Sequence, residues 1–105
     1  MRARTLLESF NYALAGFFYA IKTQRNMRIH CLMGVLVFLL GYVLDLSSVE
    51  LTVLVLTIGL VIIAEMINTA IEVVVDLVTQ EYHPLAKTAK NVAAGSVLVA
   101  AMVAV

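Results

Sequence analysis

The feature that most constrains the fold of this chain is an uncharged apolar run of 14 residues, Leu51–Ala64, which continues without a break into acidic residues. We expect one helix to carry both. Apolar residues make up 63% of the 105-residue chain, and its mean hydropathy is +1.02. That exceeds what the core of a soluble protein of this size can bury. The sequence therefore predicts a small integral membrane protein.

Three acids follow this run on one side of the expected helix: Glu65, Glu72 and Asp76. Because a helix advances about 100° per residue, they fall within about 40° of one another, with Asn68 and Thr69 on either side. A carboxylate at the centre of a membrane-spanning helix costs about 2.5–3.5 kcal/mol. Three on one face indicate a site lined by protein or water, where the acids do chemistry or bind ions. A solvated helix end is the alternative, and it suits Asp76 better than Glu65.

The composition excludes several classes of site. Seven basic and seven acidic side chains give zero net charge, so the chain lacks the basic surface that binds nucleic acid. The lone cysteine, Cys31, excludes an internal disulfide and a thiolate metal cluster. Residues 1–30 lack the apolar run and cleavage site of a secretory signal peptide. Both glycine-rich phosphate-binding motifs are absent, so any nucleotide must be held in another way.

Hydrophobic patterning predicts an all-α integral membrane helical bundle. Residues 4–23 place their apolar side chains within about 120° on a helical wheel, which is typical of an amphipathic helix lying in the membrane interface. A basic, polar elbow follows at residues 22–30. We expect three transmembrane helices within one domain over residues 1–105, at residues 29–47, 50–77 and 85–105.

The third span is the shortest in apolar residues. Val92–Val105 holds 14 of them, so a crossing of about 20 residues must recruit the turn that contains Lys87 and Lys90, or the span is cut short. The basic residues lie before the first span and after the second: Arg2, Arg4, Lys22, Arg25, Arg28, Lys87 and Lys90. By the positive-inside rule, we expect a multi-pass protein of the cell membrane with its amino terminus and the 78–91 loop in the cytoplasm.

The loop after the second span holds another polar group. Lys87, Lys90 and Asn91 share one face of the helix that Pro84 begins, at the same membrane level as the acids. Carboxylates and lysines at one level are the components of a magnesium–polyphosphate site. Anchoring of the lysines at the membrane surface is the alternative. The small residues 93–96 are expected to let helices approach closely or associate with another copy.

The two histidines have no metal-binding spacing. We expect His30 to be a polar residue at the membrane interface. His83 follows Glu81 and Tyr82 and precedes the lysines, so a nucleotide base or ribose is a possible partner.

Several motifs are similar to those of a known family: Glu65-Met66-Ile67-Asn68-Thr69-Ala70-Ile71-Glu72, Val75-Asp76, His83-Pro84-Leu85-Ala86-Lys87 and Ala89-Lys90-Asn91. From about Phe10 to Val105 the chain resembles the prokaryotic diacylglycerol kinases, small three-span membrane kinases. The motif at 83–87 and the elbow Arg25–His30 are most similar to the undecaprenol kinase branch. The resemblance implies a homotrimer with active sites shared between neighbouring subunits, and MgATP-dependent phosphorylation of a lipid hydroxyl.

The resemblance also implies roles for single residues. Glu65 matches the family's proposed general base and Glu72 a metal ligand, while Asn68, Asp76 and Lys87 line the site. The positions expected to contact ATP are Tyr12, Gln24, Glu72, Glu81, Tyr82, His83, Lys90 and Asn91.

Two positions depart from the family pattern. Gln24 stands where a second metal-binding glutamate is usual, and Asn91 where an aspartate is usual. A neutral amide still offers Mg²⁺ a carbonyl oxygen, but with less charge. A degenerate, inactive homologue is therefore one alternative.

There are alternatives both for the acceptor lipid and for the class of function. Undecaprenol, giving undecaprenyl phosphate, is the expected acceptor, and diacylglycerol, giving phosphatidic acid, is the alternative. An ion- or proton-translocating subunit needs polar groups through the whole membrane depth, whereas the two apolar spans offer only Thr52, Thr57 and glycines. A membrane scaffold explains the small residues near 93–96 but leaves the acids without a role.

Overall fold

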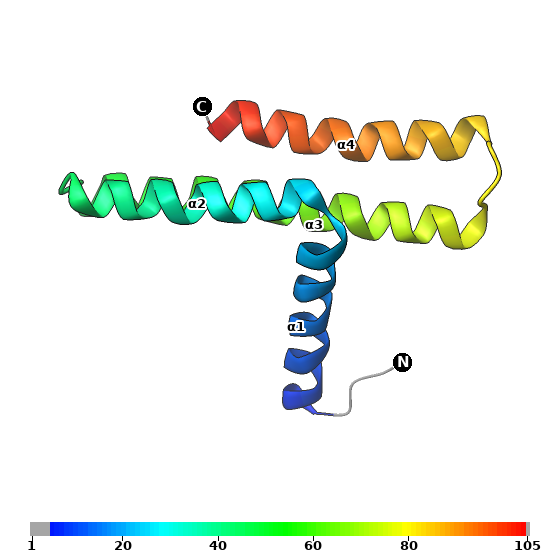
Figure 1. The fold of residues 1–105 in the computed structure, drawn as a ribbon, viewed down its shortest axis with the longest axis horizontal. Helices are drawn as coiled ribbons and strands as arrows, with labels where there is room; N and C mark the ends of the chain where they lie inside the picture. Colours follow the sequence, from blue (N-terminus) through cyan, green and yellow to red (C-terminus); the bar gives the residue numbers. More distant parts are fainter. Residues whose placement is uncertain (1–4, 105) are drawn as a thin grey trace.

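The computed structural model describes residues 5–104, which form four helices and no strand in that range. They are α1 (Leu6–Thr23), α2 (Arg25–Val43), α3 (Ser48–Val78) and α4 (Pro84–Ala104). Helix α3 is the centre of the fold: α2 packs along its first part and α4 along its second, while α1 runs across their common direction (Figure 1). Arg2, Arg4 and Val105, on which parts of the sequence predictions rest, lie outside the described residues.

Helix α3 is continuous from Ser48 to Val78, so the uncharged run and the acids do share one helix. Its start is fixed by a capping box. The Ser47 hydroxyl accepts a hydrogen bond from the Glu50 backbone N–H at 3.2 Å, and the Glu50 carboxylate accepts one from the Ser47 backbone N–H at 3.4 Å. Nothing within the helix interrupts it, since it contains no proline.

The turn from α2 to α3 follows the Schellman pattern. Asp45 has a φ of 60°, and the N–H groups of Asp45 and Leu46 donate to the carbonyls of Tyr42 and Gly41 at 3.1 Å each. This tight turn lays α2 against α3 as an antiparallel pair. Gly34 makes the approach possible, because a Cβ there would lie 2.8 Å from Ile58 Cγ2.

The connection between α1 and α2 is shorter than the expected polar elbow. Gln24 alone separates the two helices, and α2 already begins at Arg25. The Arg28 guanidinium donates to the carbonyls of Ile21 and Lys22 at 2.9 Å each. It thereby satisfies the last carbonyl groups of α1, which have no partner within their own helix. The polar residues of the elbow are therefore helical, and one arginine holds the sharp change of direction.

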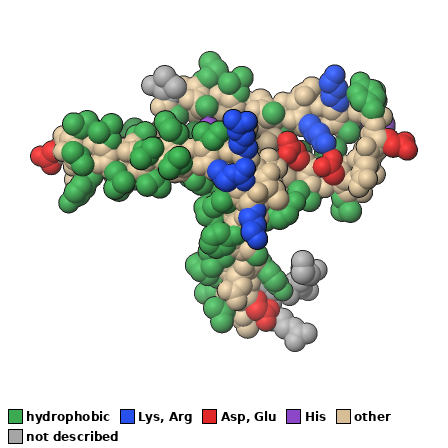
Figure 2. Space-filling view, viewed as in Figure 1, with side chains coloured by type: hydrophobic (Ala, Val, Ile, Leu, Met, Phe, Trp, Pro, Cys, Tyr) green, Lys and Arg blue, Asp and Glu red, His purple; other side chains and the backbone are tan. Residues whose placement is uncertain are grey.

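Most apolar side chains face outward. Helices α2 and α3 are long and apolar enough to cross a membrane, and most of their residues are exposed rather than packed in a core. The first helix is amphipathic, with Leu6, Phe10 and Phe18 more than half exposed. Figure 2 shows many of its apolar side chains on the side toward which α2 extends. Such a surface needs lipid or protein around it, because water would not cover it favourably.

Helix α4 begins at Pro84, so the turn with Lys87 and Lys90 belongs to it. Of the small residues near its middle, Ala93 is buried at 3% exposure. Gly95 is different, because an added Cβ would meet no atom within 4 Å. The close approach expected for residues 93–96 is therefore made by Ala93 within this chain, and by Gly34 and Gly41 of α2, whose role the sequence interpretation had not included.

Candidate active site

Three buried polar residues of α3 form an inner cluster. Glu65, Asn68 and Thr69 are exposed by 1%, 8% and 4%. The Thr69 hydroxyl donates back to the Glu65 carbonyl at 2.9 Å, so it is used within the helix. Asn68 Oδ1 is buried without a hydrogen-bond partner. The predicted polar face thus lies inside the fold at this level.

His30 of α2 contacts the inner cluster at Glu65. Its Nε2 lies 3.2 Å from Glu65 Oε1. The two atoms are close but do not form a hydrogen bond, so Glu65 Oε1 has no hydrogen-bond partner. Buried polar atoms are normally paired, and the exceptions are often functional. Asn68 Oδ1 is thus free to accept a donor from a bound molecule, while Glu65 Oε1 lies within reach of the His30 ring.

A second contact joins the connection between α1 and α2 to α3, nearer the end of α3. The Gln24 amide Nε2 donates to Glu72 Oε2 at 3.4 Å, a long hydrogen bond. Because Gln24 is the one residue between α1 and α2, the elbow itself brings this side chain to α3. The structure therefore brings together the two residues to which the sequence assigned the metal.

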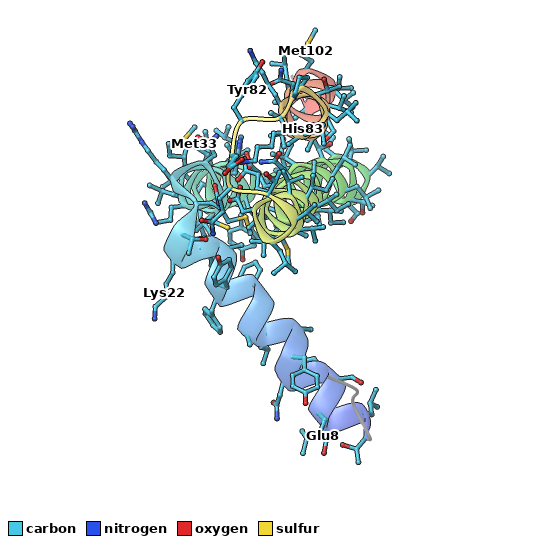
Figure 3. The ribbon with its side chains drawn as sticks, turned by 90° about the vertical axis from the view of Figure 1, so that its right-hand side faces the viewer. Glu8, Lys22, Met33, Tyr82, His83 and Met102 are labelled. Atoms are coloured by element: carbon cyan, nitrogen blue, oxygen red, sulfur yellow. The ribbon has the colours of Figure 1, made fainter. Side chains whose placement is uncertain are left out.

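An outer groove of about 420 Å³ lies between the end of α3 and the start of α4. It is lined by seven of the predicted residues, namely Asp76, Glu81, Tyr82, His83, Lys87, Lys90 and Asn91. Figure 2 shows acidic and basic side chains side by side here, and Figure 3 places Tyr82 and His83 at the loop. His83 Nδ1 accepts a hydrogen bond from the Leu85 N–H at 3.1 Å and so caps α4.

One ion pair crosses the outer groove. Lys90 Nζ lies 2.7 Å from Asp76 Oδ1, and the two side chains are 41% and 57% exposed. Exposed pairs of this kind contribute about 0–1 kcal/mol to stability. Lys90 can therefore exchange Asp76 for another anion at little cost.

Three groups of polar side chains follow one another along α3. Glu72 lies about 10.5 Å beyond Glu65 along the helix axis, and Asp76 about 6 Å beyond Glu72. The inner cluster, the Gln24–Glu72 contact and the outer groove are thus three stations on one helix. Tyr12 belongs to none of these clusters and lies exposed on α1.

The residue that the sequence interpretation missed is His30. In an antiparallel pair, residues at similar distances from the turn lie near each other, and His30 is about 3.6 turns before the end of α2 while Glu65 is about 4.7 turns after the start of α3. That signal was present, but it depends on the register of the two helices. The register is set by the turn at Asp45 and by Gly34 against Ile58.

The donor set was tested for a divalent metal. Within the described range, no three His, Cys, Asp or Glu side chains come together as a metal site. Mg²⁺ does not need such a cage, since it is usually bound by one or two carboxylates together with water and substrate phosphates. Glu72 with the Gln24 amide fits that mode, provided that the amide turns its oxygen toward the ion. These two residues therefore suit a Mg²⁺ ion that arrives bound to a polyphosphate.

Comparison with known proteins supports the motifs. The sequence profile described as prokaryotic diacylglycerol kinase matches residues 11–105. A diacylglycerol kinase of Synechocystis sp. is 55% identical over 104 residues, which are 98% of this chain and 59% of that protein. An undecaprenol kinase of Bacillus subtilis is 41% identical over 96 residues, 91% of this chain and 78% of the relative. A diacylglycerol kinase of Pseudomonas aeruginosa is 34% identical over 97 residues, 92% of this chain and 79% of the relative.

The profile covers the three stations, from Gln24 to Asn91, as well as Tyr12 and most of the residues of all four helices. The chain therefore belongs to the prokaryotic diacylglycerol kinase family, a family of membrane lipid kinases.

Proposed function

We propose that this chain transfers the γ-phosphoryl group of MgATP to the hydroxyl of a long-chain membrane lipid, with undecaprenol as the acceptor. One observation carries the proposal: the buried carboxylate of Glu65 lies on the helix whose end lines a groove that contains two lysines. A buried base suits a lipid hydroxyl, and an exposed cationic groove suits a polyphosphate. The family supports the reaction class.

We place α1 in the cytoplasmic interface of the cell membrane. Its crosswise direction and amphipathic surface support this, because the part of the fold with the outer groove extends to one side of α1 and the apolar α2 to the other (Figure 1). The basic residues 22, 25 and 28 lie at the elbow, as the positive-inside rule requires of a cytoplasmic end. In this placement α2 and α3 cross the membrane, and α4 enters it beside them as the proposed third span, with Ala104 at the depth of Met33 and Val37 of α2.

Glu65 acts as the general base in the proposed mechanism. Its carboxylate takes the proton of the lipid hydroxyl while the hydroxyl oxygen forms a bond to the γ-phosphorus. The bond from that phosphorus to the β–γ bridging oxygen breaks, and ADP leaves. Asn68, one turn along the same face, can hydrogen-bond the acceptor oxygen and orient it.

The outer groove and the Gln24–Glu72 contact compensate the negative charge of the nucleotide. Lys90 leaves Asp76 and neutralises the transferring phosphoryl group, with Lys87 beside it in the groove. Glu72 and Gln24 would hold Mg²⁺, which would screen the negative charge of the phosphates. Tyr82 and His83 are placed to contact the base or ribose, and Glu81 and Asn91 line the same groove.

The proposed assembly is a homotrimer with shared active sites. Much of the apolar surface of this chain is exposed, and Tyr12 lies outside the clusters that this chain forms by itself. A neighbouring copy whose α1 approaches the outer groove would explain both facts. The nucleotide site of this chain would then include Tyr12 of the partner subunit.

Purified protein incubated with labelled ATP, Mg²⁺ and a panel of undecaprenol and diacylglycerol tests the proposal. We expect label in undecaprenyl phosphate above phosphatidic acid. The reverse order would favour diacylglycerol, for which the 55% identical relative is named. If folded, oligomeric protein labels no lipid, the proposal fails and the inactive homologue is the better interpretation.

A further inference from the structure

The contact between His30 and Glu65 has no role in the mechanism above. It joins α2 to α3, with the histidine side chain 29% exposed and the glutamate side chain 2% exposed. The distance of 3.2 Å between Nε2 and Oε1 is at the upper end of the range for an N–H···O hydrogen bond. A small rotation of the ring would therefore complete the bond.

We propose that His30 is a positioning residue for Glu65, an inference that rests on the proposed function. A carboxylate has two oxygens, and a general base must direct one of them at the substrate. With Nε2 holding Oε1, the other oxygen, Oε2, is left for the proton of the acceptor hydroxyl. The histidine thus selects the orientation of the base and stabilises its negative charge.

No other described cation forms an ion pair with Glu65. Arg28 donates to the carbonyls at the end of α1, and Lys90 is paired with Asp76. The nearest other charged group on the same face of α3 is Glu72, which has the same sign as Glu65 and accepts from Gln24. His30 is therefore the side chain in the described range that offers Glu65 a donor from an adjacent helix.

The surroundings strengthen the contact. His30 lines a cavity of about 170 Å³ between α2, α3 and the end of α4, whose other lining residues are apolar except for Thr57. The Thr57 hydroxyl already donates to the Val53 carbonyl at 2.7 Å. With few competing polar groups, the low local dielectric makes a hydrogen bond to the carboxylate stronger than it would be in water.

Steady-state kinetics of the full chain test the inference. His30→Leu should lower kcat about ten- to hundredfold, as loss of a supporting partner of a functional group typically does, with the KM for MgATP changed less than about twofold. His30→Gln keeps a donor of similar reach and should recover most of the loss. Leu32→Met, an exposed change on the same turn, should leave both constants unchanged. An unchanged kcat in His30→Leu, or no recovery in His30→Gln, overturns the inference.

A double-mutant cycle on thermal unfolding tests the pairing without any activity. His30→Leu should lower Tm when Glu65 is present, because it leaves a buried carboxylate unpaired, and should not lower Tm in the Glu65→Leu background. Equal losses in both backgrounds overturn the inference. Since this cycle needs no substrate, a protein that phosphorylates no lipid yet shows the coupling would refute the proposed function and leave the pairing intact.

Discussion

Glu65 and Asp76 lie on the same face of one helix, about three turns apart, yet their surroundings are opposite. The Glu65 side chain is 2% exposed, and its nearest partner is a histidine ring. The Asp76 side chain is 57% exposed and paired with a lysine. The comparison shows that burial decides what a carboxylate can do here. The buried one is shielded from water, which suits the proton transfer proposed for it, while the exposed one is a counter-ion that Lys90 can exchange for the phosphate of the proposed substrate.

The largest effect is expected at the buried carboxylate. Glu65→Gln keeps the size of the side chain but removes the base, so kcat should fall about 10²- to 10⁴-fold while MgATP binding stays nearly intact. Kinetics together with nucleotide-binding titration measure both. Glu72→Gln is the comparison variant and should also weaken Mg²⁺-dependent nucleotide binding. An equal loss of binding in both variants would show that the roles are assigned wrongly.

A smaller effect is expected in the outer groove. Lys90→Met removes a charged contact to phosphate, which is worth about 1.5–3 kcal/mol, or roughly tenfold to hundredfold in kcat/KM for ATP. The loss should shrink in high salt, because the groove is exposed and screened. A kcat/KM for ATP that equals the wild-type value would contradict the assignment of Lys90 to the nucleotide.

The part of the fold that the sequence predicted well is the part governed by one helix at a time. The acid face of α3 follows from helical periodicity, and Glu65, Asn68 and Thr69 are indeed buried on it. The kinship with the family was also readable, because the motifs at 65–76 and 83–91 are local in sequence.

What the sequence did not give depends on two helices at once. The contact between His30 and Glu65 needs the register of α2 against α3, which the turn at Asp45 and the close approach at Gly34 determine. The elbow expected at residues 22–30 is shorter in the structure, because Arg28 lets the second helix begin at Arg25. Neither fact can be obtained from periodicity alone.

The third prediction concerns the Gln24–Glu72 contact, which lies between Glu65 and Asp76 along α3. Gln24→Glu places a second carboxylate within about hydrogen-bond distance of Glu72, so the Mg²⁺ concentration for half-maximal activity should fall about three- to tenfold. Without Mg²⁺ the two like charges should repel, and Tm should become more dependent on Mg²⁺ than in the wild type. Glu8→Gln, in the first turn of α1, should leave the Mg²⁺ requirement unchanged. If Gln24→Glu behaves in the same way, Gln24 does not face the metal.

The smallest effect is expected from breaking the exposed ion pair, and it separates the two regions most directly. Asp76→Asn removes a partner whose contribution is about 0.2–1 kcal/mol, so Tm should change little. Because Lys90 no longer has to leave Asp76, the KM for MgATP should fall, by at most about fivefold for that free energy. Calorimetry and ATP titration at low salt measure the two quantities. A large loss of stability, comparable with that expected for His30→Leu, would mean that the outer pair is as structural as the inner one, and that burial is not what distinguishes the two carboxylates.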